Sequence, residues 1–188
     1  AYFDHSGLYS LGRQPEALMW NLARLGGCLL PLGKEEALQD ALSAFEPELH
    51  GEFVRKVFWR LGLAHRDPES DAAVVRALYD FLAKTQAPLD AVFFDWRGGE
   101  ASAARSPATA HYASEEFTAL RAAWRDHAAS PAANLDHPYF AERDRPCSML
   151  IDEVEALWAP IAERDDWSKF SAKIEEIALM RDALGVPG

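Results

Sequence analysis

The sequence predicts an all-α fold, a bundle of helices with no sheet, on the basis of three observations. Apolar residues recur at spacings of three and four along most of the 188 residues, which is the pattern of an amphipathic helix. No stretch shows the strict alternation of polar and apolar residues that is typical of a half-buried strand. Prolines, glycines and residues that favour N-caps separate the periodic segments, at the places where helices begin and end.

The first third of the chain is expected to hold a loop and three helices. Residues 1–14 are interrupted by glycine and serine and are predicted to form the loop. A helix should follow over residues 15–31, because Pro15 suits a first helical turn, where its missing N–H is not needed. Two further helices are predicted over residues 35–45 and 48–61. The helix over residues 15–31 has an apolar face formed by Leu18, Leu22, Leu25 and Leu29.

Five more helices are predicted along the rest of the chain, with two long irregular segments between them. Asp67 and Ser114 are N-cap candidates, because acidic residues follow each of them in the expected first turn. The irregular segments cover residues 98–113 and 130–147, and loops of this length indicate a functional or partner-facing surface. The five helices are expected over residues 67–85, 88–96, 114–124, 149–164 and 167–184.

The tryptophans and cysteines lead to expectations about the core. Cys28 lies in an apolar run and is expected to be a buried thiol, whereas Cys147 follows a proline in an irregular segment. No Cys-x-x-Cys pair is present, so the sequence offers no zinc-ribbon or thioredoxin-like site. The tryptophans fall mostly on apolar helix faces and are expected to anchor the core. They are Trp20, Trp59, Trp96, Trp124, Trp158 and Trp167.

The charge of the chain argues against a nucleic-acid partner. The formal net charge is −11 at pH 7, and residues 67–188 carry −10 of it. Phosphate binding by this region would have to overcome repulsion between like charges. A membrane is not expected as a partner either, because no apolar run approaches the roughly 20 residues that span a bilayer. Two cysteines in 188 residues do not make a disulfide scaffold, so a reducing cytosol is the default and the chain is expected to be cytoplasmic.

No motif in the sequence carries a recognisable catalytic or metal site. Phosphate-binding loops, dinucleotide-binding glycine patterns, HExxH and GxSxG are all missing. Neighbouring residues on a helix point about 100° apart, so an Asp-His pair rarely shares a metal, and surface or capping roles are expected for such pairs. A metal-dependent hydrolase built on them is the weakest of the functional hypotheses. The pairs are Asp4-His5, Asp126-His127 and Asp136-His137.

One N-terminal region has an order and spacing of residues that is more specific than its amino-acid composition. It consists of residues 4–9 (DHSGLY), 13–15 (RQP), 20–25 (WNLARL) and 29–32 (LLPL). In order and spacing it resembles a signature of the selenoprotein O family, also called SelO or YdiU. The family pattern has a His-Ser stretch followed by Gly-Arg-Tyr, Asn-Gln-Pro and Trp-Asn-Leu-x-Arg-Leu. The chain departs from this pattern at Leu8 and Arg13, where the family has arginine and asparagine.

The resemblance implies a protein-kinase-like fold and the transfer of AMP from ATP, with Mg or Mn, onto Ser, Thr or Tyr hydroxyls of proteins. In the family, the residues that hold ATP and metal precede the His-Ser stretch. No catalytic residue, metal ligand or cofactor site is therefore assigned to this chain, and the chain alone should be inactive. It would comprise an activation-segment-like loop over residues 1–14 and a helical C-lobe-type domain over residues 15–188 of a bacterial protein.

The same resemblance suggests partners and residues to test. The partners would be the N-terminal catalytic part of the same protein and the protein substrates. His5, Tyr9 and Gln14 are candidates for contacting the substrate or for ordering the loop. The alternative interpretation is that these three residues only fix the loop on the first helix.

Exposed apolar surface distinguishes a part of a larger protein from an independent domain. In the first case an apolar face at Leu29, Leu30 and Leu32 should stay exposed and promote self-association. In the second case the chain would be an independent helical binding or scaffold domain of unknown ligand, without such a face.

Overall fold

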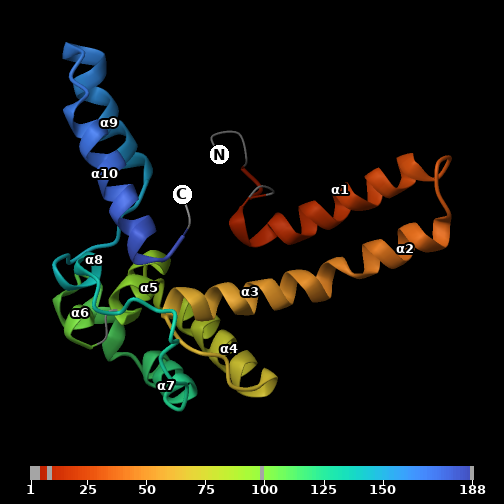
Figure 1. The fold of residues 1–188 in the computed structure, drawn as a ribbon, viewed down its shortest axis with the longest axis horizontal. Helices are drawn as coiled ribbons and strands as arrows, with labels where there is room; N and C mark the ends of the chain where they lie inside the picture. The colour runs from red at the N-terminus through yellow and green to blue at the C-terminus, as the bar shows by residue number, and fades with distance from the viewer. Residues whose placement is uncertain (1–4, 8–9, 98–99, 187–188) are drawn as a thin grey trace. The chain divides into compact units, whose positions relative to one another are not determined.

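The computed structural model describes residues 5–7, 10–97 and 100–186, apart from the side chains of residues 11 and 100–102. In this part of the chain every regular element longer than an isolated bridge is a helix (Figure 1), so the predicted all-α class is confirmed. The α-helices are α1 (Gln14–Leu29), α2 (Glu35–Ser43), α3 (Phe45–Leu61), α4 (Pro68–Thr85), α5 (Leu89–Arg97), α6 (Glu100–Arg105), α7 (Glu115–Trp124), α8 (Pro138–Ala141), α9 (Ile151–Arg164) and α10 (Ser168–Ala183). There are also two 3-10 helices, η1 (Leu11–Arg13) and η2 (Thr109–Ala113).

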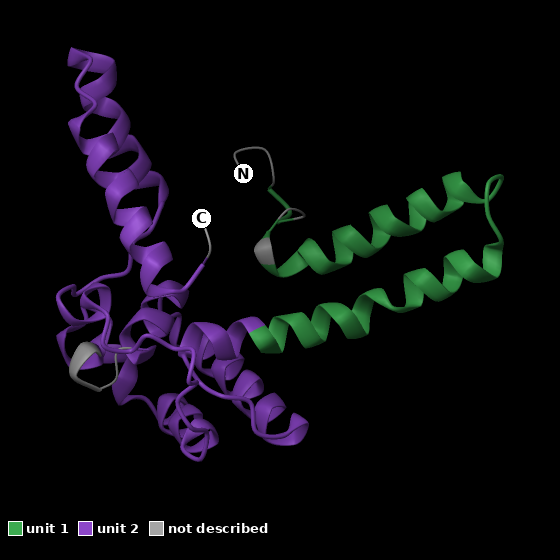
Figure 2. Cartoon of the chain, viewed as in Figure 1, with its two compact units in different colours: residues 1–55 green, residues 56–188 purple. Residues whose placement is uncertain are grey.

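The chain divides into two compact units, which Figure 2 shows in different colours. Unit 1 covers residues 1–55 and unit 2 covers residues 56–188, so the boundary falls within α3. The expected division into a loop over 1–14 and a helical domain over 15–188 stays a prediction. The 3-10 helix η1 and the first residue of α1 lie inside that expected loop.

Unit 1 has no buried residue in the part of it that the structure describes. The buried residues of α3 all lie beyond residue 55, in unit 2. As expected, Leu29, Leu30 and Leu32 are exposed, with Leu32 at 85%. Cys28 is exposed as well, so the expectation of a buried thiol is wrong. The physical reason is that, within unit 1, α2 is the helix that packs on α1 and it leaves this side of α1 uncovered.

The core of unit 2 is built by the end of α3 together with α4, α5 and α7. Helices α4 and α7 pack along each other. A smaller cluster of Phe94, Tyr139, Phe140, Cys147 and Ala183 joins α5, α8 and α10. The largest fully buried apolar side chains are Phe58, Val74, Phe81, Val92 and Leu120. Within the described ranges, none of the helices combines the length and the apolar character needed to cross a bilayer.

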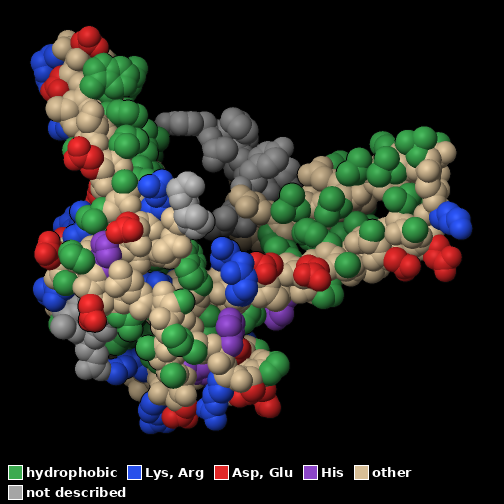
Figure 3. Space-filling model, in the orientation of Figure 1, with side chains coloured by type: hydrophobic (Ala, Val, Ile, Leu, Met, Phe, Trp, Pro, Cys, Tyr) green, Lys and Arg blue, Asp and Glu red, His purple; other side chains and the backbone are tan. Residues whose placement is uncertain are grey.

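Helices α9 and α10 form a hairpin that leaves one apolar face uncovered. In the space-filling view, apolar side chains gather along one side of this hairpin (Figure 3). Trp158 on α9 and Trp167 at the start of α10 are about half exposed or more, as is Trp20 on α1. The expected core role is therefore wrong for these three tryptophans. Their helical spacing correctly indicated an apolar face, but within its own unit each of these faces lacks a covering layer.

Several element boundaries differ from the sequence expectation. Helix α3 begins at Phe45 instead of residue 48, because Pro47 falls in its first turn, where proline is tolerated. The expected loop over 98–113 contains α6 and η2, and α6 is rich in alanine, the strongest helix former. The irregular segment 130–147 contains α8.

Both predicted N-caps are confirmed. The Asp67 side chain accepts a hydrogen bond from the Ser70 amide at 2.9 Å, and Ser114 Oγ accepts one from the Phe117 amide at 3.1 Å. Each bond satisfies an amide that the helix itself leaves without a partner. These caps fix the starts of α4, which carries Asp71 of the polar cluster described below, and of α7, which precedes His127 of the same cluster.

Candidate functional site

The residues proposed from the sequence lie mainly on exposed positions of unit 1. His5 is exposed in a turn, and Gln14 is exposed as the first residue of α1. Tyr9 lies outside the described residues. The proposed roles of these three residues in substrate contact or loop ordering stay predictions.

Asp126 and His127, the members of one Asp-His pair, have separate partners. Asp126 lies near Arg66, with 3.7 Å between Oδ2 and Nη1, whereas His127 is buried and turns to a different residue. His137 caps α8 by accepting from the Tyr139 amide at 3.1 Å. Asp4 lies outside the described residues. Among those that are described, no group of three or more His, Cys, Asp or Glu side chains could hold a metal ion.

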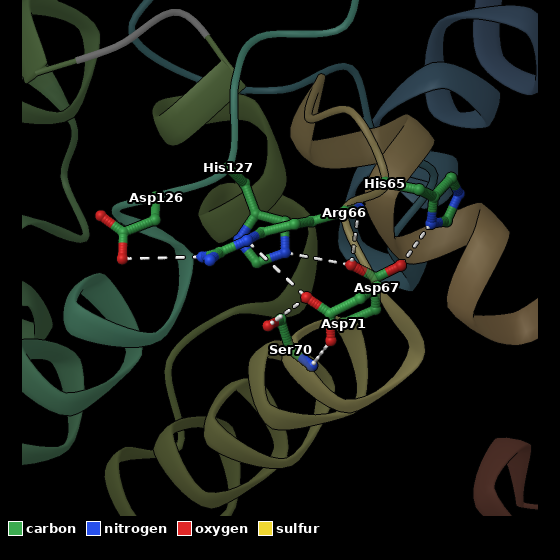
Figure 4. A network of polar contacts seen from close by, with 7 residues as sticks. All are labelled: His65, Arg66, Asp67, Ser70, Asp71, Asp126 and His127. Carbon is green, nitrogen blue, oxygen red and sulfur yellow. Dashed lines mark hydrogen bonds and ion pairs between the residues drawn. The ribbon is translucent and has the colours of Figure 1, made fainter.

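A buried carboxylate with two histidines is the most connected polar group of unit 2 (Figure 4). We call Asp71, His65 and His127 the Asp71 cluster. His65 Nδ1 lies 2.8 Å from Asp71 Oδ2, and His127 Nε2 lies 3.0 Å from Asp71 Oδ1. The Arg66 amide also donates to Asp71 Oδ1, at 3.1 Å. A carboxylate only accepts hydrogen bonds, so both histidines present N–H groups to Asp71.

Three segments that are distant in sequence supply this cluster. Asp71 is in the first turn of α4 and only 7% exposed, His65 is in the α3–α4 loop, and His127 follows α7. Phe58, on α3, covers both imidazoles: its ring is stacked on His65 at a centroid distance of 4.7 Å and tilted against His127 at 5.2 Å. The cluster therefore ties the start of α4 to the ends of α3 and α7.

The electrostatics of the cluster favour an ionised Asp71. Burial pushes the pKa of Asp71 upward, but hydrogen bonds from His65, the Arg66 amide and His127 outweigh burial and hold the pKa below its ordinary value. The start of α4 also favours negative charge through the helix dipole. Because Asp71 contacts both imidazoles directly, each of its oxygens and each facing ring nitrogen has a hydrogen-bond partner, whereas His127 Nδ1 is buried without one. The cluster stabilises the fold and has no free ligand set for a metal.

A second buried ionic group holds the α9–α10 hairpin, and we call it the Lys173 cluster. Lys173, on α10, is 5% exposed and forms ion pairs with Glu153 on α9 and with Glu176 one turn along α10. Arg143 pairs with Glu176, and Ser148 Oγ donates to Glu153 at 2.8 Å. The hydrogen bond from Lys173 is the main reason why the pKa of Glu153 lies below its ordinary value.

Neither cluster has a complete signal in the sequence. His65 and Asp71 are six residues apart across an N-cap, and His127 is 56 residues further along the chain from Asp71. Local periodicity cannot indicate a contact over that distance. The spacing of Lys173 and Glu176 does suit neighbours on one helix face, but it does not reveal that Lys173 is buried or that Glu153 faces it.

Comparison with known proteins finds relatives that are named protein nucleotidyltransferases. It is 27% identical over 192 residues to a protein nucleotidyltransferase YdiU of Synechocystis sp., which covers 94% of this chain and 40% of that protein. A Gloeobacter violaceus protein of the same name is 28% identical over 186 residues, covering 90% of this chain and 37% of the relative. A third, from Chromohalobacter salexigens, is 38% identical over 90 residues, covering 48% and 18%.

The family described as protein adenylyltransferase SelO matches residues 1–178. The chain belongs to the SelO family, and the membership predicted from its N-terminal region is confirmed. It spans about 40% of the length of the Synechocystis relative and somewhat less of the Gloeobacter one.

Proposed function

We propose that this chain is the C-terminal helical part of a SelO-family protein that transfers AMP from ATP to Ser, Thr or Tyr hydroxyls of proteins. The family match over residues 1–178 carries this proposal. We further propose that the part of the family proteins that this chain does not match supplies the ATP and metal site. In support, both oxygens of Asp71 accept hydrogen bonds from the imidazoles of the Asp71 cluster, and the described residues contain no set of metal ligands.

The role we propose for unit 1 is to pack its apolar face on the N-terminal catalytic part of the same protein. The face is carried by α1, where Leu18, Leu22 and Leu25 are exposed. Burying the remaining exposed area of one such leucine stabilises a complex by roughly 1 kcal/mol. The described residues of unit 1 include no buried one, so burial within the unit offsets little of the conformational entropy lost on its ordering, and a covering partner accounts for its structure.

The test of the catalytic assignment is AMP transfer by the chain alone. The chain is incubated with a protein acceptor, Mg²⁺ or Mn²⁺, and ATP that carries its radiolabel in the α-phosphate. The label that becomes attached to protein is then measured. We expect no incorporation above that of a heat-denatured sample. The full-length Synechocystis relative serves as the comparison under the same conditions. Reproducible AMP incorporation by the isolated chain would contradict the proposal that the nucleotide site lies elsewhere.

The exposed face of α1 predicts self-association of the chain in solution. Replacing Leu18 and Leu25 with glutamine should shift the chain toward monomer in light scattering and lower its binding of an apolar fluorescent dye. The matched control replaces Leu89 and Leu179, two exposed leucines of unit 2, and should change dye binding less.

The same measurements distinguish the proposed part of a larger protein from the second candidate function, an independent helical binding or scaffold domain. The observation that favours it is the separate core of unit 2. A monomeric chain without dye-binding apolar surface would support this second candidate and argue against the docking role of unit 1.

A further inference from the structure

Unit 2 contains a largely apolar cavity of about 580 Å³ between the end of α3, α5, α8 and α10. This volume falls within the range of small-molecule sites in proteins. The cavity is also bordered by the segment from Pro146 to Met149, just before α9. Its apolar lining includes Phe93, Phe94, Phe140, Ile177, Met180 and Leu184.

A buried cation that forms no ion pair with any described residue lines this cavity. Arg97, the last residue of α5, is 3% exposed. Its Nη1 donates to the carbonyl oxygens of Trp59 and Arg60 at the end of α3, and its guanidinium lies 5.6 Å from the Phe140 ring centroid. Its Nε is buried and has no hydrogen-bond partner. No carboxylate of the described residues forms an ion pair with it.

Such an arrangement is unusual, because buried charges in proteins are almost always paired. The carbonyls at the C-terminus of α3 offset part of the charge through the helix dipole, but none of the described carboxylates supplies a counterion for the guanidinium. The other two charged residues of the lining, Arg60 and Asp90, neutralise each other through an ion pair of 2.7 Å. The cavity lining therefore carries a net charge of +1 in a chain of net charge −11.

We propose that this cavity binds a small organic carboxylate with an apolar body, and that Arg97 is the group that pairs with the carboxylate. A single negative charge neutralises the lining, whereas a doubly charged phosphate would leave it negative. A guanidinium matches a carboxylate in geometry and forms strong charge-assisted hydrogen bonds with it. The aromatic and aliphatic walls take the apolar body of the ligand. The rival interpretation is that Arg97 serves only to hold the end of α3.

The experiment compares octanoate with 1-octanol, which has the same apolar body without the charge. Binding of each to the full chain is measured by titration calorimetry at low salt. We expect one saturable octanoate site and an affinity at least about ten-fold higher for octanoate than for octanol. Equal affinities, or no saturable octanoate binding, would overturn the proposal without any variant being needed.

Two variants locate the site. Arg97→Gln should remove the preference for octanoate over octanol, and the matched control Arg76→Gln, at an exposed position of α4, should retain it. Met180→Trp fills the cavity with Arg97 intact and should abolish binding of both compounds. Persistent binding to Met180→Trp would place the ligand on the exposed faces of α1 or α9–α10 and overturn the assignment. If circular dichroism shows that Arg97→Gln does not fold, binding to Met180→Trp and the comparison of octanoate with octanol still test the proposal.

Discussion

Replacing Asp71 with asparagine is expected to lower the free energy of unfolding by about 3 kcal/mol. The wild-type carboxylate accepts hydrogen bonds from His65, His127 and the Arg66 amide while nearly buried. Asparagine keeps one oxygen and places an NH₂ group against an imidazole N–H, so one buried donor loses its acceptor. Leaving a buried polar group unsatisfied costs more than the net contribution of an ordinary hydrogen bond.

The change is measured by urea unfolding followed by circular dichroism at neutral pH. The matched control is Asp67→Asn in the same helical turn. Asparagine caps helices about as well as aspartate, and Asp67 is exposed, so the control should change stability by less than about 0.5 kcal/mol. If the two variants were equally stable, the Asp71 cluster would have no special role in holding α4.

The same pair of proteins tests the pH dependence of the cluster. The pKa of Asp71 is lower in the folded chain than its ordinary value of 3.8. The stabilisation by its charge is therefore complete above about pH 3.8 and is lost as the pH falls through the folded pKa. We expect the stability difference between wild type and Asp71→Asn to shrink below that pH and to stay constant just above it.

Replacing Lys173 with alanine is expected to destabilise the α9–α10 hairpin by about 3 kcal/mol. The substitution removes a nearly buried cation that faces Glu153 and Glu176. These two carboxylates would then face each other without the intervening positive charge, although Ser148 and Arg143 still contact them. Removing one partner of a buried ionic group costs more than the group contributes as a whole.

Hydrogen exchange measured by mass spectrometry localises this effect. Amides of α9 and α10 should exchange roughly 100-fold faster in Lys173→Ala, while those of α4 and α7 change little. Lys169→Ala, at an exposed position one turn earlier on α10, is the matched control and should leave the exchange unchanged. Equal acceleration in α4 and α7 would show that the hairpin does not open separately.

The helices and their caps could be predicted from the sequence because both depend on neighbouring residues. Asp67 and Ser114 cap their helices through bonds to residues three positions ahead, which is a local interaction. Burial was predicted less well, as Cys28 and Trp158 show. Both follow an apolar helical pattern, yet whether such a face is buried depends on a covering layer, and the helix itself carries no signal of that layer.

The N-terminal region was sufficient to identify the family, but it did not reveal the polar clusters of unit 2. His5 and Gln14 belong to unit 1 and are exposed, and their roles stay predictions. The Asp71 cluster depends on α4 and α7 packing together, and the Arg97 charge is significant only because α5 ends against the last turn of α3. These are tertiary relations, and the sequence offered a local expectation only for His127, a capping or surface role.

The two histidines of the Asp71 cluster differ in the length of chain that their bonds close. The His65 bond spans six residues and the His127 bond spans 56. The short loop can close as soon as α4 begins to form, whereas the long one costs more entropy and needs α7 in place. Loss of the His127 bond should therefore mainly accelerate unfolding, and loss of the His65 bond should also slow folding. On this basis His127 sets the lifetime of the folded state, and His65 contributes to the rate at which that state is reached.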